Sequence, residues 1–419
     1  MGIFKQYTGL PRQVYIICFA RIVTSMGAFI FSMNSLLMTT VLGLSEVATG
    51  YVMVLLAVCD IVGALIGGRL SDYYGRKKTI IAAMTVETVA LILGGIYVRR
   101  MIVIFFEAVT LTCFAMFFPV IGAMITDKTG EGKREESFSL LFLCINVGYS
   151  VGQSIAGAIF YNYTEWIFWG MGIATVITMV LLGLFVRDEY VPICKRTDEV
   201  QVREAVEVYE AERVSDGRNL ISLILKDKPL VLFLIASVLF GYAYTQVSYM
   251  MPLQYSGYFG AEIGSKWVAR LWIVNSVFCI IWSPIILKMT KDKNEFLVIT
   301  WTAVLFAVGM GSFALIKDIS LAWLVYILTP IWTAGEVIMS VHNSILLGSR
   351  AEEEYRARFQ SLYEFTHGAG RMIGPVTMGY FLVSHSYNMG WILVAGLCII
   401  AGIILISAYK IDRSSDNRA

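Results

Sequence analysis

Residues Gly67–Lys78 read GGRLSDYYGRKK, and this polar stretch lies directly between two long apolar runs. It contains three glycines, one acid and four cationic side chains. Glycine permits tight turns, and clustered Lys and Arg stay at a membrane surface because their burial in hydrocarbon is costly. The stretch therefore predicts a tight turn that joins two membrane-spanning helices.

The composition of the whole chain supports this interpretation. Of its 419 residues, 57% are hydrophobic and only 15% are charged, and the mean hydropathy is +0.70. The apolar residues form runs of roughly 20, enough for a helix to cross ~30 Å of hydrocarbon. A net charge of +2 gives no reason to expect a nucleic-acid partner. The seven cysteines form no CxxC pair, which favours reduced core residues over a metal or disulfide site.

The spacing of the runs predicts an all-α membrane protein with twelve transmembrane helices in two six-helix bundles. We expect bundles at 1–186 and 230–419, joined by a charged linker at 187–229. The predicted helices are 13–38, 46–68, 79–97, 101–126, 137–161, 166–186, 230–254, 266–288, 296–316, 320–347, 358–383 and 388–409.

The distribution of basic residues predicts the orientation. With the N-terminus inside, the inner turns, the linker and both tails hold 26 of the 33 Lys and Arg, and the outer loops hold four. Cytoplasmic loops carry such an excess. We therefore expect a multi-pass protein of the cell (inner or plasma) membrane, in contact with the lipid bilayer, with both termini cytoplasmic.

Glycine spacing indicates an internal repeat. The fifth predicted helix contains Gly148, Gly152 and Gly157, and the eleventh contains Gly370, Gly374 and Gly379, each 222 residues later. Small residues at this spacing let helices approach closely in lipid. Two halves of shared ancestry are the interpretation we adopt.

With these features together, the chain resembles the major facilitator superfamily of secondary transporters. Residues Gly68–Lys78 match that family's GxLxDxxGRKx turn between its second and third helices, and the stretch from Pro119 through Asp127 to Arg134 is also similar. The resemblance implies two bundles around a central cavity. It also implies a latch formed by Gly68, Asp72, Gly75, Arg76 and Asp127, in which Arg76 reaches Asp127.

We expect Gly75 to permit the turn and Asp72 to cap the third helix and pair with a base. The corresponding turn of the second half, Lys288–Asn294, keeps charge but lacks the glycines. The latch is therefore expected in one half, where it favours the outward-facing state.

Within the family, the drug:proton antiporters look most similar. The resemblance rests on Arg21 with Gly27, on Gln246 with Pro252, and on Gly335-Glu336. One position departs: Gly152-Gln153 stands where that branch has Gly-Pro, and the proline occurs instead in Gly374-Pro375.

Ionisable residues inside the predicted spans are the candidates for proton coupling, because a charge in hydrocarbon is costly and therefore usually functional. Arg21 and Asp60 lie at one depth and could form an ion pair, either as a proton switch or as a static link. Glu336 could exchange a proton, or a salt bridge, with His367 or Arg371, which are one turn apart. Alternatively, His367 could be a packed neutral side chain. Glu107 lies near the outer mouth. The full set is Arg21, Asp60, Glu107, Glu336, His367 and Arg371.

Two further ionisable residues are expected to be structural. His342 is interpreted as a satisfied interfacial group, and Glu87 as a buried acid packed against the second or fourth helix.

A cavity with aromatic walls and few charges suits amphipathic or cationic organic molecules. The expected lining is Asn34, Asn146, Gln153, Tyr242, Gln246, Tyr249, Trp272 and Asn275. No P-loop, HExxH or nucleophile motif is found in the sequence, so we expect no enzymatic activity, no metal and no cofactor.

The leading hypothesis is a monomeric, proton-coupled transporter that exports a small, amphipathic organic molecule by alternating access. A proton symporter for nutrient uptake, and a lipid flippase or sensor of the same fold, are the alternatives.

Overall fold

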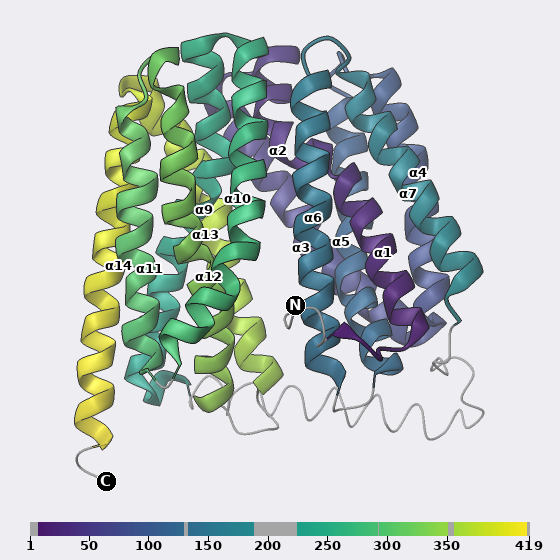
Figure 1. Cartoon of the computed structure of the whole chain (residues 1–419). Helices are drawn as coiled ribbons and strands as arrows, with labels where there is room; N and C mark the ends of the chain where they lie inside the picture. The colour runs from purple at the N-terminus through teal and green to yellow at the C-terminus, as the bar shows by residue number, and fades with distance from the viewer. Residues whose placement is uncertain (1–6, 130–132, 188–223, 292, 351–355, 417–419) are drawn as a thin grey trace. The chain divides into compact units, whose positions relative to one another are not determined.

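The computed structural model describes residues 7–129, 133–187, 224–291, 293–350 and 356–416, and these are almost entirely helical (Figure 1). Most of the predicted linker at 187–229 lies outside these described residues. Packing divides the chain into two compact units. The N-terminal unit comprises Met1–Gly43, Leu55–Glu204 and Val268–Ser276, and the C-terminal unit comprises Leu44–Val54, Ala205–Trp267 and Val277–Ala419.

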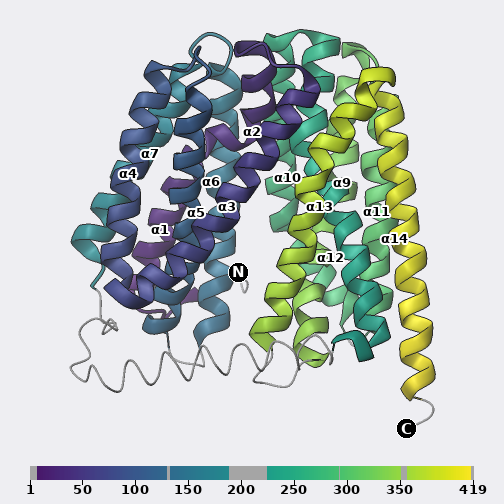
Figure 2. The same ribbon diagram turned by 180° about the vertical axis from the view of Figure 1, so that it is seen from behind.

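The first half of the chain supplies seven α-helices and one π-helical turn. They are α1 (Arg12–Gly27), α2 (Phe29–Leu36), the π-helical turn η2 (Leu37–Val41), α3 (Glu46–Tyr74), α4 (Arg76–Ile96), α5 (Val103–Lys128), α6 (Arg134–Ile159) and α7 (Glu165–Phe185). Within the N-terminal unit α1 packs against α6 and α7, and α4 packs against α5 and α7, as Figure 2 shows from behind.

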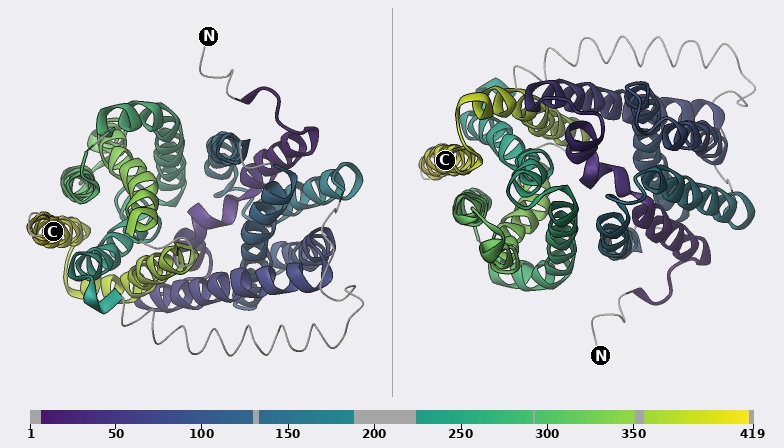
Figure 3. Two further views of the ribbon diagram at one scale, coloured as in Figure 1. Left: turned by 90° about the horizontal axis from the view of Figure 1, so that it is seen from below. Right: turned by 90° about the horizontal axis from the view of Figure 1, so that it is seen from above.

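The second half repeats this plan. Its elements are α9 (Lys228–Phe259), α10 (Ala261–Thr290), α11 (Glu295–Gly311), the 3-10 turns η5 (Ser312–Leu315) and η6 (Ile319–Leu324), α12 (Val325–Arg350), α13 (Arg356–Ser384) and α14 (Tyr387–Asp416). Within the C-terminal unit α9 packs against α13 and α14, and α11 packs against α12 and α14, which Figure 3 shows along the helix axes.

Eleven helical segments in the described part of the chain are long and apolar enough to cross a membrane. The eleventh predicted span, 358–383, corresponds to α13, which is 29 residues long but is not among them. It carries charged side chains, Glu364 and Arg371, and these lower its hydropathy. The all-α membrane fold is therefore confirmed, and the count of twelve spans stays a prediction.

The repeated glycines allow close helix packing at matching places in both units. A Cβ on Gly148 of α6 would lie 2.5 Å from the carbonyl oxygen of Ile22, and a Cβ on Gly370 of α13 would lie 1.9 Å from that of Val238. Each glycine thus lets the fifth helix of its unit touch the backbone of the first helix. Ile22 and Val238 are 216 positions apart and occupy matching places, so the packing supports the internal repeat.

Candidate functional site

Glu336 is the centre of a polar cluster inside the C-terminal unit. It lies in the middle of α12, and its Oε1 atom accepts a 2.8 Å hydrogen bond from the Tyr244 hydroxyl of α9. Its Oε2 atom lies 3.8 Å from Sγ of Cys279 on α10. Three helices therefore contribute to the environment of one carboxyl group.

Small residues position this carboxyl group. A Cβ on Gly335 would lie 2.9 Å from the ring of Phe306, so the glycine allows α12 to pack closely on α11. At the same point the hydroxyl of Thr302 donates a 3.1 Å hydrogen bond to the Gly335 carbonyl oxygen. Close packing and a backbone contact together fix the segment that carries Glu336.

His367 and Arg371 of α13 lie beside the same tyrosine. A Cβ on Gly241 of α9 would lie 2.0 Å from the carbonyl oxygen of His367, so this glycine is what brings the two helices together. The His367 ring lies 6.4 Å from the Tyr244 ring and stacks at 5.7 Å on Tyr363. Arg371 is close enough to act electrostatically on both His367 and Tyr244. The structure therefore brings Glu336, His367 and Arg371 into one neighbourhood, with Tyr244 between them.

Arg21 of α1 is buried in the N-terminal unit. Its guanidinium lies over three phenylalanine rings of α5, at 5.9 Å from Phe114, 5.1 Å from Phe117 and 4.4 Å from Phe118. Aromatic faces of this kind stabilise a desolvated cation. The expected ion pair between Arg21 and Asp60 stays a prediction.

Glu107 of α5 and the predicted lining residues of the N-terminal unit are also buried. Glu107 is fully enclosed, with the side chain of Asn34 facing its carboxyl group. The Ser32 hydroxyl donates to Oε1 of Gln153, which links α2 to α6. The amide of Asn146 donates to the Phe142 carbonyl oxygen at 3.0 Å.

The other predicted lining residues lie on α9 and α10, and those of α9 make hydrogen bonds. The Thr377 hydroxyl donates to the Tyr242 hydroxyl at 3.2 Å, and the Gln246 amide donates to the Tyr242 carbonyl oxygen at 3.2 Å. The Tyr249 hydroxyl donates to the Glu46 carbonyl oxygen at 2.5 Å. Trp272 and Asn275 lie on α10. A lining role for these residues stays a prediction.

His342 has partners and Glu87 is buried, as expected, but the hydrogen-bond partner of Glu87 lies on α7, the sixth predicted span, and not on the second or fourth. Nδ1 of His342 lies 2.6 Å from Oε2 of Glu295, and Nε2 lies 2.8 Å from the Thr290 hydroxyl, so both ring nitrogens have partners. Glu87 is buried and accepts a 3.5 Å hydrogen bond from Thr175 of α7.

The opening stretch forms the turn between α3 and α4. Gly75 is the residue before α4 and has φ of 104°, a conformation that favours glycine. Arg76 donates to Asp72 and, at 3.3 Å, to Oδ2 of Asp127 on α5, as the resemblance implies. Lys77 donates to the Val186 carbonyl oxygen at the end of α7 at 2.8 Å. The turn therefore joins the ends of four helices.

One expectation for this turn was wrong. Asp72 does not cap the helix after the turn, because it lies in the last turn of α3 and no side chain caps α4. The helix that contains Asp72 continues to Tyr74, which leaves Gly75 as the only residue between the two helices. The expected pairing of Asp72 with a base is confirmed, because Asp72 forms an ion pair with Arg76 four residues later.

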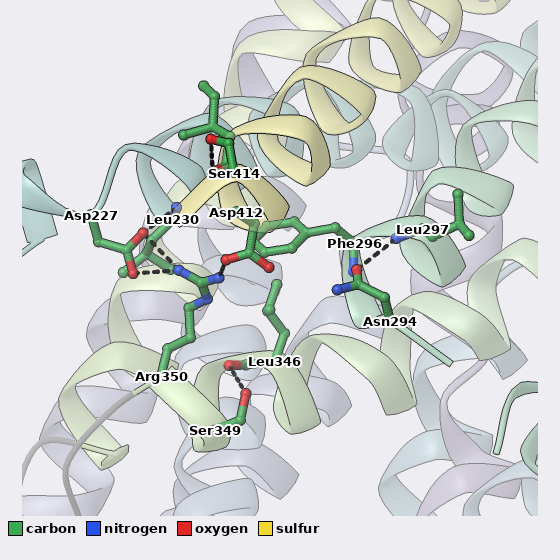
Figure 4. A network of polar contacts seen from close by, with 11 residues as sticks. Asp227, Leu230, Asn294, Phe296, Leu297, Leu346, Ser349, Arg350, Asp412 and Ser414 are labelled. Atoms are coloured by element: carbon green, nitrogen blue, oxygen red, sulfur yellow. Dashed lines mark hydrogen bonds and ion pairs between the residues drawn. The ribbon is translucent and has the colours of Figure 1, made fainter. Parts of the chain in front are cut away.

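The C-terminal unit has a charged cluster of its own, formed by residues outside the corresponding turn. Figure 4 shows Arg350, the last residue of α12, between Asp227 and Asp412. It donates to both oxygens of Asp227 at 2.8 Å and lies 4.9 Å from the ring centre of Phe296 on α11. Asp227 also caps α9 by accepting a 3.1 Å hydrogen bond from the Leu230 amide. We call Asp227, Arg350 and Asp412 the Arg350 cluster.

The Arg350 cluster lines a cavity of about 520 Å³ together with Lys226, Lys228 and Ser349. It joins the ends of α9, α12 and α14. Thus both units join their helix ends through an arginine held between two aspartates, but the two arginines stand at different places in the repeat.

Comparison with known proteins decides the family. A family model described as Major Facilitator Superfamily matches residues 17–366. The chain belongs to the major facilitator superfamily. A Na(+), Li(+), K(+)/H(+) antiporter from Planococcus maritimus is 21% identical over 383 residues, which is 85% of this chain and 86% of that protein. This superfamily member is therefore related over most of its length to a transporter.

Two further relatives differ in how much they cover. The class G tetracycline resistance protein of Vibrio anguillarum is 30% identical over 115 residues, 26% of this chain and 27% of that protein. A solved structure of a peptide transporter in complex with sulfate superposes with a TM-score of 0.75 at 15% identity, over 96% of this chain and 95% of that one. At that identity the superposition establishes the shared superfamily fold alone.

Sequence reasoning missed three groups at these sites. Tyr244 and Cys279 contact Glu336, and Arg350 joins helix ends of the C-terminal unit. Tyr244 lies on the same helix as Tyr242 and Gln246, which were predicted to line the cavity. Only the rotation of α9 about its axis determines which of these side chains faces Glu336. Arg350 stands at the end of a predicted span, a place where basic residues are common, so the sequence carried no special signal for it.

Proposed function

We propose that this chain is a proton-coupled secondary transporter that exports a small, amphipathic organic molecule by alternating access. Membership of the superfamily and relatives that are transporters support the general activity. The similarity to a tetracycline resistance protein favours export of an organic molecule.

The observation that carries the coupling is the environment of Glu336. A carboxyl group inside an apolar unit is stable either as a neutral acid or as an anion with partners. Tyr244 donates to Glu336, and Arg371 acts electrostatically on Tyr244. Small rotations of α9 or α13 would change these contacts and so change the affinity of Glu336 for a proton.

The remaining candidates have roles in the same cycle. Glu107, Asp60 and Arg21 are proposed as the proton-linked groups of the N-terminal unit, with the neutral polar residues named above lining the substrate path. Arg76 with Asp72 and Asp127 is proposed as a latch outside the path. Both termini are proposed to lie in the cytoplasm, with the protein a monomer in the cell membrane.

Reconstituted vesicles provide the test. Wild-type protein and the variant Glu336→Gln are compared in vesicles with an imposed pH gradient, with a fluorescent amphipathic cation as the transported probe. We expect gradient-driven transport in the wild type and a loss of at least tenfold in the variant. Wild-type transport that persists after the proton gradient is collapsed would contradict proton coupling, and net uptake in cells would favour the symporter.

A second candidate function is exchange of monovalent cations for protons. The specific observation in its favour is the Planococcus maritimus relative, whose name describes Na(+), Li(+) and K(+) exchange for H(+) and whose similarity covers most of both chains. Addition of Na⁺ or K⁺ to vesicles that hold a pH gradient, in the absence of any organic probe, tests it: dissipation of the gradient supports cation exchange.

A further inference from the structure

Glu107 is a buried carboxyl group with one neighbouring polar side chain, that of Asn34. It has no exposed surface, and neither carboxylate oxygen makes a hydrogen bond of normal geometry. Glu87, the other buried acid of this unit, differs because it accepts a hydrogen bond from Thr175. A carboxyl group inside a span is stable when it binds a proton or when a cation balances its charge, so Glu107 is a candidate to exchange one for the other.

The groups beside Glu107 are oxygen atoms without partners. The Asn34 amide faces the carboxyl group, and its Oδ1 atom makes no hydrogen bond. Thr110 lies three residues after Glu107 on the same face of α5, and its hydroxyl is also without a partner. Asn34 and Thr110 are 4% and 1% exposed, so both side chains are shielded from bulk solvent.

The helix that carries Asn34 is broken on both sides of it. The helical hydrogen bonding of α1 ends at Ala28, where ψ is 46°, and a new helix begins at Phe29. After α2 the chain adopts a π-helical turn at Leu37–Val41, with the Leu42 amide bonded to the Leu37 carbonyl oxygen at 3.1 Å. Breaks and π-turns inside spans are frequent at functional sites, and interrupted helices hold coupling ions in secondary transporters.

We propose that Glu107, Asn34 and Thr110 form a binding site for a dehydrated monovalent cation, with Na⁺ as the ion tested. One carboxylate balances one positive charge, and the amide and hydroxyl oxygens are the hard ligands that such an ion prefers. No group of three His, Cys, Asp or Glu residues that could hold a metal ion exists among the described residues, which argues against a divalent or soft metal. The role of the site in transport rests on the cation exchange proposed above, whereas binding is measured without it.

Binding of ²²Na⁺ to the purified full-length protein tests the site, with choline chloride to hold the ionic strength constant. We expect saturable binding to the wild type. Glu107→Gln should weaken it at least tenfold because it removes the balancing charge. Thr110→Val keeps the charge and the side-chain shape, so it serves if the first variant fails to fold, and it should weaken binding severalfold.

A matched variant makes the result specific. Glu87→Gln removes a buried acid of the same unit and should leave ²²Na⁺ binding unchanged. Because binding is measured without a proton gradient, failure of the proposed proton coupling is distinguishable from failure of this site. Absence of saturable binding to the wild type, or equal binding by the wild type and a folded Glu107 or Thr110 variant, overturns the proposal.

Discussion

Gly75 lies between two helices with φ of 104° and ψ of 149°, a region of backbone space that is almost restricted to glycine. A side chain there strains the backbone whatever the surrounding space. Gly68, seven residues earlier inside α3, is different, because a Cβ on it would meet no atom within 4 Å. Within one motif, Gly75 is therefore needed for its backbone conformation, whereas no neighbouring atom requires a glycine at Gly68.

We expect Gly75→Ala to lower the free energy of unfolding by about 1–3 kcal/mol. Gly68→Ala, the control, should raise it by about 0.5–1 kcal/mol, because alanine loses less backbone entropy in a helix. Thermal unfolding of the purified protein in detergent compares the two variants. Equal effects would show that the positive φ of Gly75 is not needed.

Tyr244 provides a second prediction at the residue scale. Tyr244→Phe removes the hydroxyl that donates a hydrogen bond to Glu336 and keeps the ring that contacts His367 and Trp332. Loss of a hydrogen bond to a charged group costs about 1.5–3 kcal/mol. We therefore expect proton-driven transport to fall about tenfold or more, measured as the initial rate in vesicles. Tyr326→Phe, on the exposed surface of the same unit, should leave the rate unchanged, and a similar fall there would point to a general effect of tyrosine loss.

At the scale of the elements, pairs of helices touch through glycine. The pair α9 and α13 is the closest case, with Gly241 and Gly370 each facing a carbonyl oxygen of the other helix. Because backbone atoms cannot move aside as a side chain can, an added methyl group must separate the helices. The contact that brings His367 to Tyr244 thus depends on the absence of two side chains.

Gly370→Ala should therefore destabilise the protein by about 1–3 kcal/mol, as overpacking in a filled interior does. Gly148→Ala, its counterpart in α6, should have a smaller effect because the clash distance is 2.5 Å rather than 1.9 Å. Gly396→Ala on α14 meets no atom within 4 Å and is the neutral control. Denaturant or thermal unfolding ranks the three variants, and the reverse order would contradict the packing argument.

At the scale of the whole molecule, the asymmetry of basic residues predicts the topology. Lys317, between η5 and η6, is one of the four basic residues of the predicted outer loops, and Lys291, after α10, belongs to a predicted inner turn. In a background without the seven native cysteines, Lys317→Cys should react in intact cells with a thiol reagent that does not cross membranes. Lys291→Cys should react only after the membrane is permeabilised. The opposite pattern would reverse the predicted orientation.

Much of the architecture was predictable because it depends on signals close together in the sequence. Apolar runs predict the helices, and the motif that includes Arg76 predicts its contact with Asp127, because family resemblance supplies a partner 51 residues away. The prediction that Asp72 caps the next helix is wrong because α3 extends beyond its apolar run and includes Asp72. Tyr244 and Arg350 were not predictable, since their partners lie 62 residues or more away and depend on how each helix is rotated.

Matching positions in the two units are separated by two different sequence offsets. The carbonyl partners Ile22 and Val238 are 216 positions apart, whereas Gly148 and Gly370 are 222 apart. The ends of α3 and α10 keep the shorter offset, at Tyr74 and Thr290, and the ends of α5 and α12 show the longer one, at Lys128 and Arg350. The offset between matching helix ends thus rises by six residues between the second and fourth spans. Under the shared ancestry that we infer, an insertion or deletion in this interval accounts for the change, and the left-handed glycine Gly75 and the two arginines, Arg76 and Arg350, belong to the parts where the halves differ.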